Sequence, residues 1–583
     1  KRADSLLTES QKWTDIVRES AKDWIAELTA LRAGISSLKE EDMTTAFNEY
    51  DRKISSLERK AEIYRKQQFR SSIGGSSFYV TRSWPYEPFK GQDTPLDSTI
   101  GPVNLTLLKR EWADVAFNIT NVSEKPIAVR CVVRYNSDSF DKIGFPGLNL
   151  RWQVALPVAS VDNNSTCDAI MQLPAGVVTI SPGVTTQVWL SVQAPLETKE
   201  LLREGVVRFE LIDGSVGNPL MVPISVHVVP VDLIANPPIH CFTWNLIGLP
   251  GNHDPQWLKK HYDDLLEHGV DMCLMHGYRL MPRPKAKPDG TIEAMDFSRM
   301  DAVIKATKKD FRLYYATVDI FSGDEPVTDF FGIPFGTPAY EKAYKTWIKG
   351  IIGRFKKHGI GYDHFIVNPA DELSTNNALL LTKWVKEVDP KVVTVLDSIN
   401  NLEQLKKFDK YCDIWMPHFN HYQSESYTEP IAYLRKIGKP LWVYYYSEGA
   451  TEKHEHPSRR YMYRFWWAFA NNVKGMGYWA QQYYGDPWYR APEVARYDTS
   501  LVYPSENELV PSRRWQAWRQ GWQDYCLFDL ATSKLTAAKD SNGKAQLDSL
   551  IADFISRPAD PAVADKARDF ARDVLARSSA GMK

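Results

Sequence analysis

The sequence predicts a multidomain α/β protein: a β-sandwich precedes a (β/α)8 barrel of the TIM type, a helical hairpin lies before both, and a helical segment follows them. Three observations support this fold class. The chain has 583 residues, which is too long for one core. Its apolar residues follow first a helical period, then a strand-like pattern, and then the two in alternation. Residues 236–528 hold eight such alternating units, the number and size that a (β/α)8 barrel requires.

The first element is the helical hairpin, which we expect over residues 1–72. Apolar side chains recur at steps of four and three in residues 43–64, and residues 13–38 fit the same seam. Two amphipathic helices should therefore pack against each other and turn near residues 39–42. We interpret this hairpin as a structural or oligomerising arm, through which the chain could form a homo-oligomer.

The second element is the β-sandwich, which we expect over residues 73–235. Short β-prone runs such as PIAVRCVVRY and VTTQVWLSVQAP alternate there with turn signals. No constellation of reactive side chains accompanies them, so we interpret this part as an accessory domain. Cys131 and Cys167 both fall in it, and the sequence leaves open whether they form a disulfide.

The third element is the barrel, residues 236–528. Its eight predicted strands are residues 239–246, 270–276, 312–318, 364–368, 391–397, 412–418, 440–446 and 475–480. Amphipathic helical stretches lie between them, for example residues 339–357, 376–388 and 458–471. An open doubly wound sheet is the alternative, but no G-x-G-x-x-G motif follows the first strand, so the fingerprint of a dinucleotide-binding fold is missing. Residues 529–583 return to a helical pattern and are expected to pack on the outside of the barrel.

Composition excludes several classes of function. The net charge is -1, so no basic excess supports binding to nucleic acid or to an anionic membrane. No apolar run approaches the roughly 20 residues of a membrane span. The six cysteines form no C-x-x-C pair, and we expect no metal and no cofactor. The chain begins at Lys1 without a methionine, so we expect a processed chain, an export signal before it, and a secreted or periplasmic location of bacterial type.

The candidate site follows from the barrel, because barrel enzymes build their sites at the carboxyl ends of the strands. The residues at or just after the predicted strand ends are Asn245, His276, Asp319, Asp371, Glu372, Asp397, His418, Asn420, Tyr446, Trp479 and Gln481, and Asp486 lies in the loop after the eighth strand. The set is acidic, amide-rich and aromatic, and it is poor in lysine, cysteine and clustered histidine. This composition argues against phosphate substrates, Schiff-base chemistry and a metal centre. It suits a neutral polyhydroxylated substrate, so a glycan or glycoconjugate is the expected ligand.

The most specific feature is the adjacent acid pair Asp371 and Glu372. Retaining glycosidases place two carboxyl groups about 5–5.5 Å apart and inverting ones about 6.5–9.5 Å apart, on opposite sides of the scissile bond. Neighbouring residues cannot easily straddle the anomeric carbon in that way, but both can reach one face of a sugar. This geometry fits substrate-assisted catalysis, in which the 2-acetamido group attacks C1, Glu372 acts as acid and base, and Asp371 orients the acetamido nitrogen. The alternatives are an N-cap followed by a first-turn acid, and a competing pair, Asp324 and Glu325, after the third strand.

Several segments, taken in order, resemble the catalytic domain of glycoside hydrolase family 123. They are the strand that ends in the acid pair, DIWMPH, KPLWVYYY, SRRYMYRFWWAFANNVKGMGYWA, YYGDPW and LVYPSENELVPSRRWQAWRQGWQDY. The resemblance implies a β-N-acetylgalactosaminidase-like enzyme with a β-sandwich before its barrel, which acts on glycolipid or related glycans by substrate-assisted catalysis. It implies that Asp371 orients the acetamido group, that Glu372 is the acid and base, and that Tyr446 and Trp479 close around the acetamido group. The chain departs from the family pattern at Leu373, where related proteins often have proline.

Two other functions remain open at this point. One is a glycosidase on a sugar without an acetamido group, with Glu372 as acid and a distant carboxylate such as Asp319 or Asp397 as nucleophile or base. The other is a non-catalytic carbohydrate-binding protein, against which the intact acid pair argues.

Overall fold

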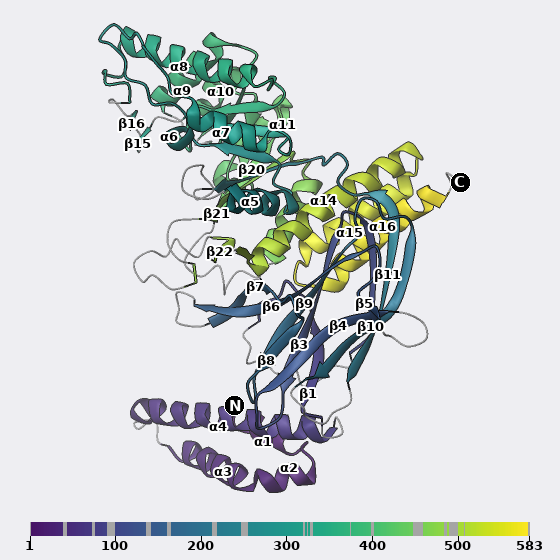
Figure 1. Ribbon diagram of the computed structural model, residues 1–583. Helices are drawn as coiled ribbons and strands as arrows, with labels where there is room; N and C mark the ends of the chain where they lie inside the picture. The colour runs from purple at the N-terminus through teal and green to yellow at the C-terminus, as the bar shows by residue number, and fades with distance from the viewer. Residues whose placement is uncertain are drawn as a thin grey trace.

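The computed structural model describes most of the chain (Figure 1). The described ranges are residues 2–38, 43–72, 76–89, 100–135, 142–159, 165–212, 219–245, 255–318, 321–322, 325–326, 330–373, 375–397, 401–446, 459–482, 487–488, 500–505 and 508–580. Figure 1 shows the N-terminal helices at one end, a region of long strands in the middle, and a unit of alternating strands and helices at the other end. None of the described helices is both long and apolar enough to cross a membrane. The secreted or periplasmic location stays a prediction.

The N-terminal region forms four helices rather than the two that were predicted. They are α1 (Arg2–Ser10), α2 (Asp15–Ser20), α3 (Lys22–Ser36) and α4 (Met43–Ser72). A turn at Lys12 and Trp13 ends α1, because their N–H groups bond to the carbonyls three residues before them. Trp13 and Trp24 stack with 5.3 Å between ring centroids, and both lie 5.7 Å from Tyr64 of α4. The two limbs therefore pack as a hairpin on a small core of their own. The predicted turn at residues 39–42 lies outside the described residues, and the oligomerising role stays a prediction.

Two sheets follow the helices. The first has the order β1 (Phe78–Ser83), β3 (Trp112–Asn121), β9 (Thr185–Gln193), β6 (Asn149–Ala159) and β7 (Ser165–Gln172). The second has the order β2 (Val103–Lys109), β11 (Leu220–Asp232), β10 (Leu201–Leu211), β4 (Ile127–Tyr135) and β5 (Lys142–Ile143), with β8 (Val177–Ile180) on β4. Both sheets supply one hydrophobic cluster, in which Phe117 and Phe209 lie 5.2 Å apart. Shared packing of this kind is consistent with the predicted β-sandwich. Cys131 and Cys167 are both buried free thiols.

Each of the eight runs predicted as barrel strands contains a strand. They are β12 (His240–Asn245), β13 (Met272–Met275), β14 (Leu313–Thr317), β17 (Phe365–Asn368), β18 (Val393–Leu396), β19 (Ile414–Trp415), β20 (Trp442–Tyr446) and β21 (Gly475–Gln482). Parallel ladders join β13, β14, β17, β18 and β19 in chain order, and β20, β21 and β12 in a second series. Single parallel bridges, Trp415 with Leu441 and His418 with Tyr444, connect the two series. Neighbours in sequence are therefore neighbours in space, and the last strand pairs with the first.

One hydrophobic cluster takes side chains from all eight strands, as the inside of a barrel would. Alternate residues of a strand enter it, for example Phe242 and Trp244 of β12, and Trp442 and Tyr444 of β20. Within the described part of the chain no ladder joins β12 to β13. The closed barrel therefore stays a prediction, whereas the parallel eight-strand order is observed.

Helices separate these strands. They are α5 (Pro255–Glu267), α6 (Gly277–Leu280), α7 (Ser298–Thr307), α8 (Pro338–Lys357), α9 (Asn376–Val388), α10 (Leu402–Phe408), α11 (Thr428–Ile437) and α13 (Arg459–Ala470). The short elements are β15 (Phe321–Ser322), β16 (Glu325–Pro326), η2 (Asp409–Tyr411), η3 (Phe419–Tyr422), η4 (Glu425–Tyr427), β22 (Val502–Pro504) and β23 (Leu509–Pro511). Helices α8, α9 and α13 occupy the stretches predicted as helical. Thr337 and Thr375 begin α8 and α9, because their side chains accept the N–H groups of Tyr340 and Ala378.

The C-terminal helices connect the two halves of the molecule. They are α14 (Arg513–Ala537), α15 (Ser541–Ser556) and α16 (Pro561–Ala580). Helix α14 runs without a break across residue 528, where the barrel was predicted to end. In Figure 1 it lies between the eight-strand unit and the two sheets. Helix α16 packs on α14 and also on β11 and β2. These helices pack on α13 and α14, and α16 has a second partner in the β-rich region that was not predicted.

Candidate active site

Asn368 organises the carboxyl end of β17. It is the last residue of the strand, and Pro369 follows it, which cannot donate to a further ladder bond. The Asn368 side chain is buried and donates to the hydroxyl oxygen of Tyr315 at 2.7 Å and to Asp397 Oδ2 at 2.9 Å. Its own Oδ1 accepts the N–H of Ala370 at 2.9 Å. Tyr315 belongs to β14 and Asp397 follows β18, so one amide ties three neighbouring strands together.

Asp397 fixes the turn that carries the acid pair. Its Oδ1 accepts the backbone N–H of Glu372 at 2.8 Å, and its carboxyl group is hydrogen-bonded to that of Asp371. Glu372 has a φ of 54°, a left-handed conformation that a residue with a side chain rarely adopts. The turn therefore points the carboxyl groups of two adjacent residues into different surroundings.

Burial and like charge raise the pKa of both aspartates. Burial raises the pKa of Asp371 to about 6, and the charge of Glu372 adds to this effect. Burial also raises the pKa of Asp397 well above its ordinary value, and the charge of Asp371 raises it further. The charged groups that act on these two carboxyls are all acidic. Of the two carboxyls, Asp397 therefore holds a proton more strongly than Asp371 does.

Glu372 differs from Asp371 in exposure and in partner. It is exposed, and its Oε1 accepts the hydroxyl of Tyr444 at 2.5 Å. Burial and the nearby carboxylates raise the pKa of Tyr444 far above its ordinary value, so this hydroxyl stays a neutral donor. Glu372 can thus exchange a proton at the open side of the group, while Asp371 stays behind it.

Aromatic rings flank the acid pair. His418 follows β19, and its ring centroid lies 5.2 Å from that of Tyr444 and 4.5 Å from that of Tyr446. Tyr446 is 40% exposed. The backbone N–H of Asn420 donates to His418 Nδ1 at 3.3 Å. Flat amphipathic rings beside carboxylates suit a sugar, whose ring has apolar C–H faces.

The structure places Gln481 away from this group. Its side chain is buried and donates to Asp264 Oδ2 of α5 at 2.9 Å, and Trp515 of α14 donates to the same oxygen. Gln481 therefore joins β21 to two helices, α5 and α14. Trp479 is partly buried and packs on the interior cluster that contains Tyr444.

The remaining predicted residues are only partly described. His276 begins α6, and burial lowers its pKa to about 4, so it is neutral at neutral pH. Asn245 pairs with Gln482 through the backbone, and its side chain lies outside the description. Asp319 and Asp486 lie outside the described residues, as does Asp324 of the competing pair.

Three residues of the group were missed. Tyr315 and Tyr444 stand within strands, where the prediction named no residue, and Asn368 is the last residue of β17 but was not named among the residues at strand ends. A period of two along β20 would have indicated Tyr444, because it shares a face with Tyr446. Nothing local indicates Asn368 or Tyr315, since their partners come from neighbouring strands.

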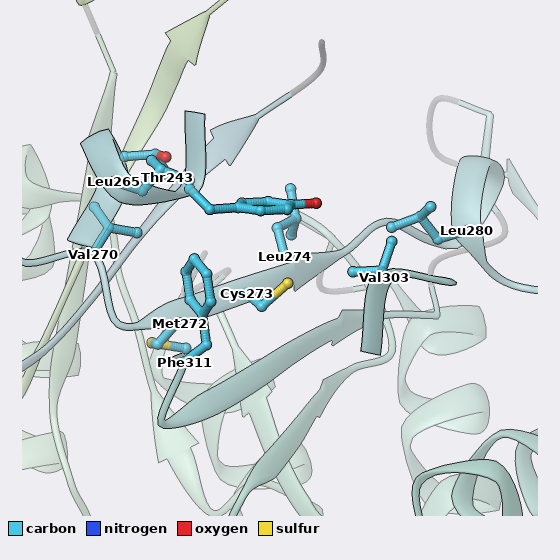
Figure 2. Close-up of a pocket in the computed structure, with 10 residues that line it drawn as sticks. Thr243, Leu265, Val270, Met272, Cys273, Leu274, Leu280, Val303 and Phe311 are labelled. Atoms are coloured by element: carbon cyan, nitrogen blue, oxygen red, sulfur yellow. The ribbon is translucent and has the colours of Figure 1, made fainter. Parts of the chain in front are cut away.

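A small cavity lies beside the strands but does not suit a sugar. Figure 2 shows the side chains that converge on it from β12, β13, α5 and α7, among them Thr243, Leu265 and Val303. Its volume is about 20 Å³, which is room for about one water molecule. Burial raises the pKa of its thiol, Cys273, to about 12, which leaves the thiol unreactive. The cluster of three carboxyl side chains, those of Asp371, Glu372 and Asp397, is therefore the better candidate site.

The chemistry available to that group is proton transfer. No cluster of three or more acidic, histidine or cysteine side chains with metal-binding geometry occurs among the described residues. One exposed glutamate stands next to a partly buried aspartate that is hydrogen-bonded to a second, buried aspartate. Carboxyl groups with different surroundings can take different roles in acid and base catalysis.

The part of the eight-strand unit from β14 to β21 matches a known enzyme family. Residues 293–531 match the family model described as glycoside hydrolase 123, catalytic domain. The range contains Asp371, Glu372, Asp397 and Tyr444 together with the strands that hold them. The resemblance to this family that the sequence predicts is confirmed, and these residues form a glycoside hydrolase domain.

One solved structure has a similar fold over most of the chain, and two others are similar to a lesser degree. A family 123 glycoside hydrolase from Clostridium perfringens, studied for glycolipid glycan hydrolysis, is similar with a TM-score of 0.67 and 11% identity, over 86% of this chain and all of that one. A glycosyl hydrolase family 2 member from Bacteroides cellulosilyticus has a TM-score of 0.26 and 14% identity, over 64% of this chain and 44% of that one. A GH113 β-1,4-mannanase has a TM-score of 0.33 and 10% identity, over 49% of this chain and 98% of that one. A search of curated proteins gave no match.

Proposed function

We propose that this glycoside hydrolase removes a terminal β-linked N-acetylhexosamine, N-acetylgalactosamine in particular, with retention of configuration and with the substrate's own acetamido group as nucleophile. The premise is the match of residues 293–531 to the family 123 catalytic domain. The similar Clostridium perfringens enzyme acts on glycolipid glycans, and a glycolipid or related glycan is the substrate class that we propose here.

One observation carries the proposal: two adjacent carboxyl groups have opposite surroundings. Glu372 is exposed and accepts a tyrosine hydroxyl, while Asp371 is hydrogen-bonded to Asp397 behind it. Neither residue stands across a sugar from the other, so the pair lacks the geometry of an acid facing a protein nucleophile. A nucleophile supplied by the substrate removes this difficulty.

In the first step Glu372 donates its proton to the glycosidic oxygen. The acetamido carbonyl oxygen forms a bond to C1 as the bond from C1 to the leaving oxygen breaks, which gives an oxazolinium ion and releases the aglycone. Asp371, as a carboxylate, accepts the acetamido N–H and stabilises the positive charge that develops there. In the second step the Glu372 carboxylate takes a proton from water. The water oxygen bonds to C1 as the bond from C1 to the acetamido oxygen breaks, which opens the oxazolinium ring and restores the acetamido group.

The bonds of Asp397 do not support the alternative mechanism, in which a distant carboxylate acts as nucleophile or base. Its two oxygens already accept the N–H of Glu372 and the amide of Asn368, and its carboxyl group bonds to Asp371. A nucleophile must reach C1 of the sugar, whereas Asp397 is 1% exposed and lies behind these bonds.

The test is release of p-nitrophenol from its β-N-acetylgalactosaminide, β-N-acetylglucosaminide and β-galactoside. We expect turnover of the acetamido sugars only, and a loss of at least about 100-fold in Glu372→Gln, since general acid catalysis is worth that much. Glu403→Gln is the matched control, because Glu403 is an exposed acid on α10 paired with Lys407. Inhibition by a thiazoline that mimics the oxazolinium ion is expected as well. Efficient turnover of the galactoside without thiazoline inhibition would overturn the proposal, and binding without turnover across a glycan panel would indicate a binding protein.

A further inference from the structure

The bonds around Asp397 have a consequence for the acid pair. The residue reaches both members of the pair from another strand: its Oδ1 accepts the N–H of Glu372, and its carboxyl group bonds to Asp371. Asn368 holds the second oxygen at 2.9 Å. Asp397 is 1% exposed, so solvent does not compete for these bonds.

The left-handed backbone of Glu372 needs such a bond. A φ of 54° costs a residue with a side chain about 1–2 kcal/mol, and the surrounding structure must hold it. The hydrogen bond from the Glu372 N–H to Asp397 holds the backbone of this turn to the end of a second strand. Without it the turn can relax, and the Glu372 carboxyl group would move relative to Tyr444.

The carboxyl–carboxyl bond also requires a proton, because two ionised carboxylates repel each other. The polar and ionisable groups that face the pair are Glu372 in the turn, Tyr315 of β14, Tyr444 of β20, and His418 beside Tyr444. None of these is a lysine or arginine, so no permanent cation offsets a second negative charge in this described set.

We propose that Asp397 is a positioning residue: it stays protonated, donates that proton's hydrogen bond to the Asp371 carboxylate, and fixes the backbone of Glu372. This inference rests on the proposed function for the roles of Asp371 and Glu372, and it assigns Asp397 no contact with the sugar. It replaces the expectation that Asp397 binds a substrate hydroxyl. The proton on Asp397 is not consumed in the reaction; it lets Asp371 stay ionised as the acetamido group takes up positive charge.

The experiment compares Asp397→Ala and Asp397→Asn with the wild type. In Asp397→Ala we expect kcat to fall about 100-fold through misplacement of the acid pair, with KM within about threefold. The acidic limb of the kcat/KM profile should move to higher pH, since Asp371 loses the donor that favours its ionised form. Asp397→Asn should recover only part of kcat and part of the limb: its amide oxygen can accept from Glu372 and its NH2 can donate to Asp371, but that NH2 can no longer accept from Asn368.

Asp413→Ala is the matched control. Asp413 also accepts a backbone N–H of a neighbouring strand, that of Thr394 at 2.8 Å, but at the opposite ends of the strands. It should leave kcat and the acidic limb unchanged. A raised KM with unchanged kcat and limb in Asp397→Ala would make Asp397 a sugar ligand and overturn the proposal.

A second readout keeps the inference separate from the proposed activity. Infrared spectra of the wild type at neutral pH should contain the C=O band of a protonated carboxyl group, which Asp397→Asn should lack. If the wild type hydrolyses none of the acetamido sugars, the proposed function fails, and the presence or absence of this band decides the proton assignment alone. Absence of the band in the wild type would overturn that assignment.

Discussion

Buried carboxylates occur in two regions of the molecule, and the regions treat them in opposite ways. Where α14 joins the β-rich region, Arg514 lies 3.1 Å from Asp168 and Arg519 lies 3.1 Å from Asp114, with all four side chains at most 4% exposed. In the candidate site, Asp371 and Asp397 meet each other. At the junction, a guanidinium compensates each negative charge. In the candidate site, we propose that a proton on Asp397 does so.

The difference shows which chemistry each region can perform. An aspartate held by an arginine stays ionised and serves as a fixed link between parts of the chain. Carboxyls that lack a cation keep a proton near neutral pH, which is the property that acid and base catalysis uses. Burying acids without a cation lowers the free energy of unfolding. This loss is expected in a candidate active site, where the proton is useful, but it would only weaken the contact between α14 and the β-rich region.

The largest expected effect is at the junction. Arg514→Met should lower the free energy of unfolding by about 3–5 kcal/mol, because it leaves Asp168 buried without its cation. Urea denaturation measures this loss. Arg557→Met is the control, since its pair with Asp553 is exposed on the surface, and it should cost less than about 1 kcal/mol.

The double variant Arg514→Met with Asp168→Asn sharpens the same test. It should recover part of the loss, because the buried charge is removed together with its partner. Equal losses in the single and double variants would show that packing around Arg514, and not charge compensation, stabilises the junction.

The second effect has the opposite sign. The pKa of Asp371 in the folded protein, about 6, is above its ordinary value, so the stability linked to its protonated form is lost as pH rises through about 6. Asp371→Asn removes this loss. The variant should unfold at a higher urea concentration than the wild type at pH 7, by about 2 kcal/mol, and the difference should vanish near pH 4.

Asp289→Asn provides the contrasting case. The hydroxyl and N–H of Thr291 hold the pKa of Asp289 below its ordinary value, so its contribution is present at neutral pH and is lost as pH falls. That variant should be less stable than the wild type at pH 7. A stability of Asp371→Asn that does not change with pH relative to the wild type would contradict the uncompensated burial of Asp371.

The comparison also explains what could be predicted from the sequence. The eight runs predicted as barrel strands are continuous β-prone stretches. Their own residues favour a strand, so each strand could be predicted from its local sequence. The run SRRWQAWRQGWQDY of α14 carries arginines that would normally face solvent. Their burial depends on Asp168 and Asp114, more than 300 residues away in sequence, so the length and placement of α14 could not be predicted locally.

The candidate site divides in the same way. Asp371, Glu372 and Asp397 could be predicted because each follows a strand. The bond from Asp397 to the Glu372 N–H could not, because it depends on the left-handed turn at Glu372. The partner of Gln481 could not be predicted either, since β21 runs to Gln482, two residues beyond its predicted end, which places Gln481 inside the strand with its side chain toward α5.

The smallest expected effect concerns two tyrosines that each donate a hydrogen bond to a carboxylate, one at the junction and one in the candidate site. Tyr503 donates to Asp168 at 2.6 Å, where Arg514 also binds, and Tyr444 donates to Glu372 at 2.5 Å. Tyr503→Phe should cost about 1 kcal/mol of stability and leave kcat unchanged, because a cation still holds its carboxylate. Tyr444→Phe should lower kcat about tenfold, a loss of about 1.4 kcal/mol in transition-state stabilisation, and change the urea midpoint little. Unfolding curves and steady-state kinetics on both variants separate the two outcomes. If both variants lost stability alone, the Tyr444 hydroxyl would be a structural link like that of Tyr503, and the distinction between a compensated junction and an uncompensated site would not extend to Glu372.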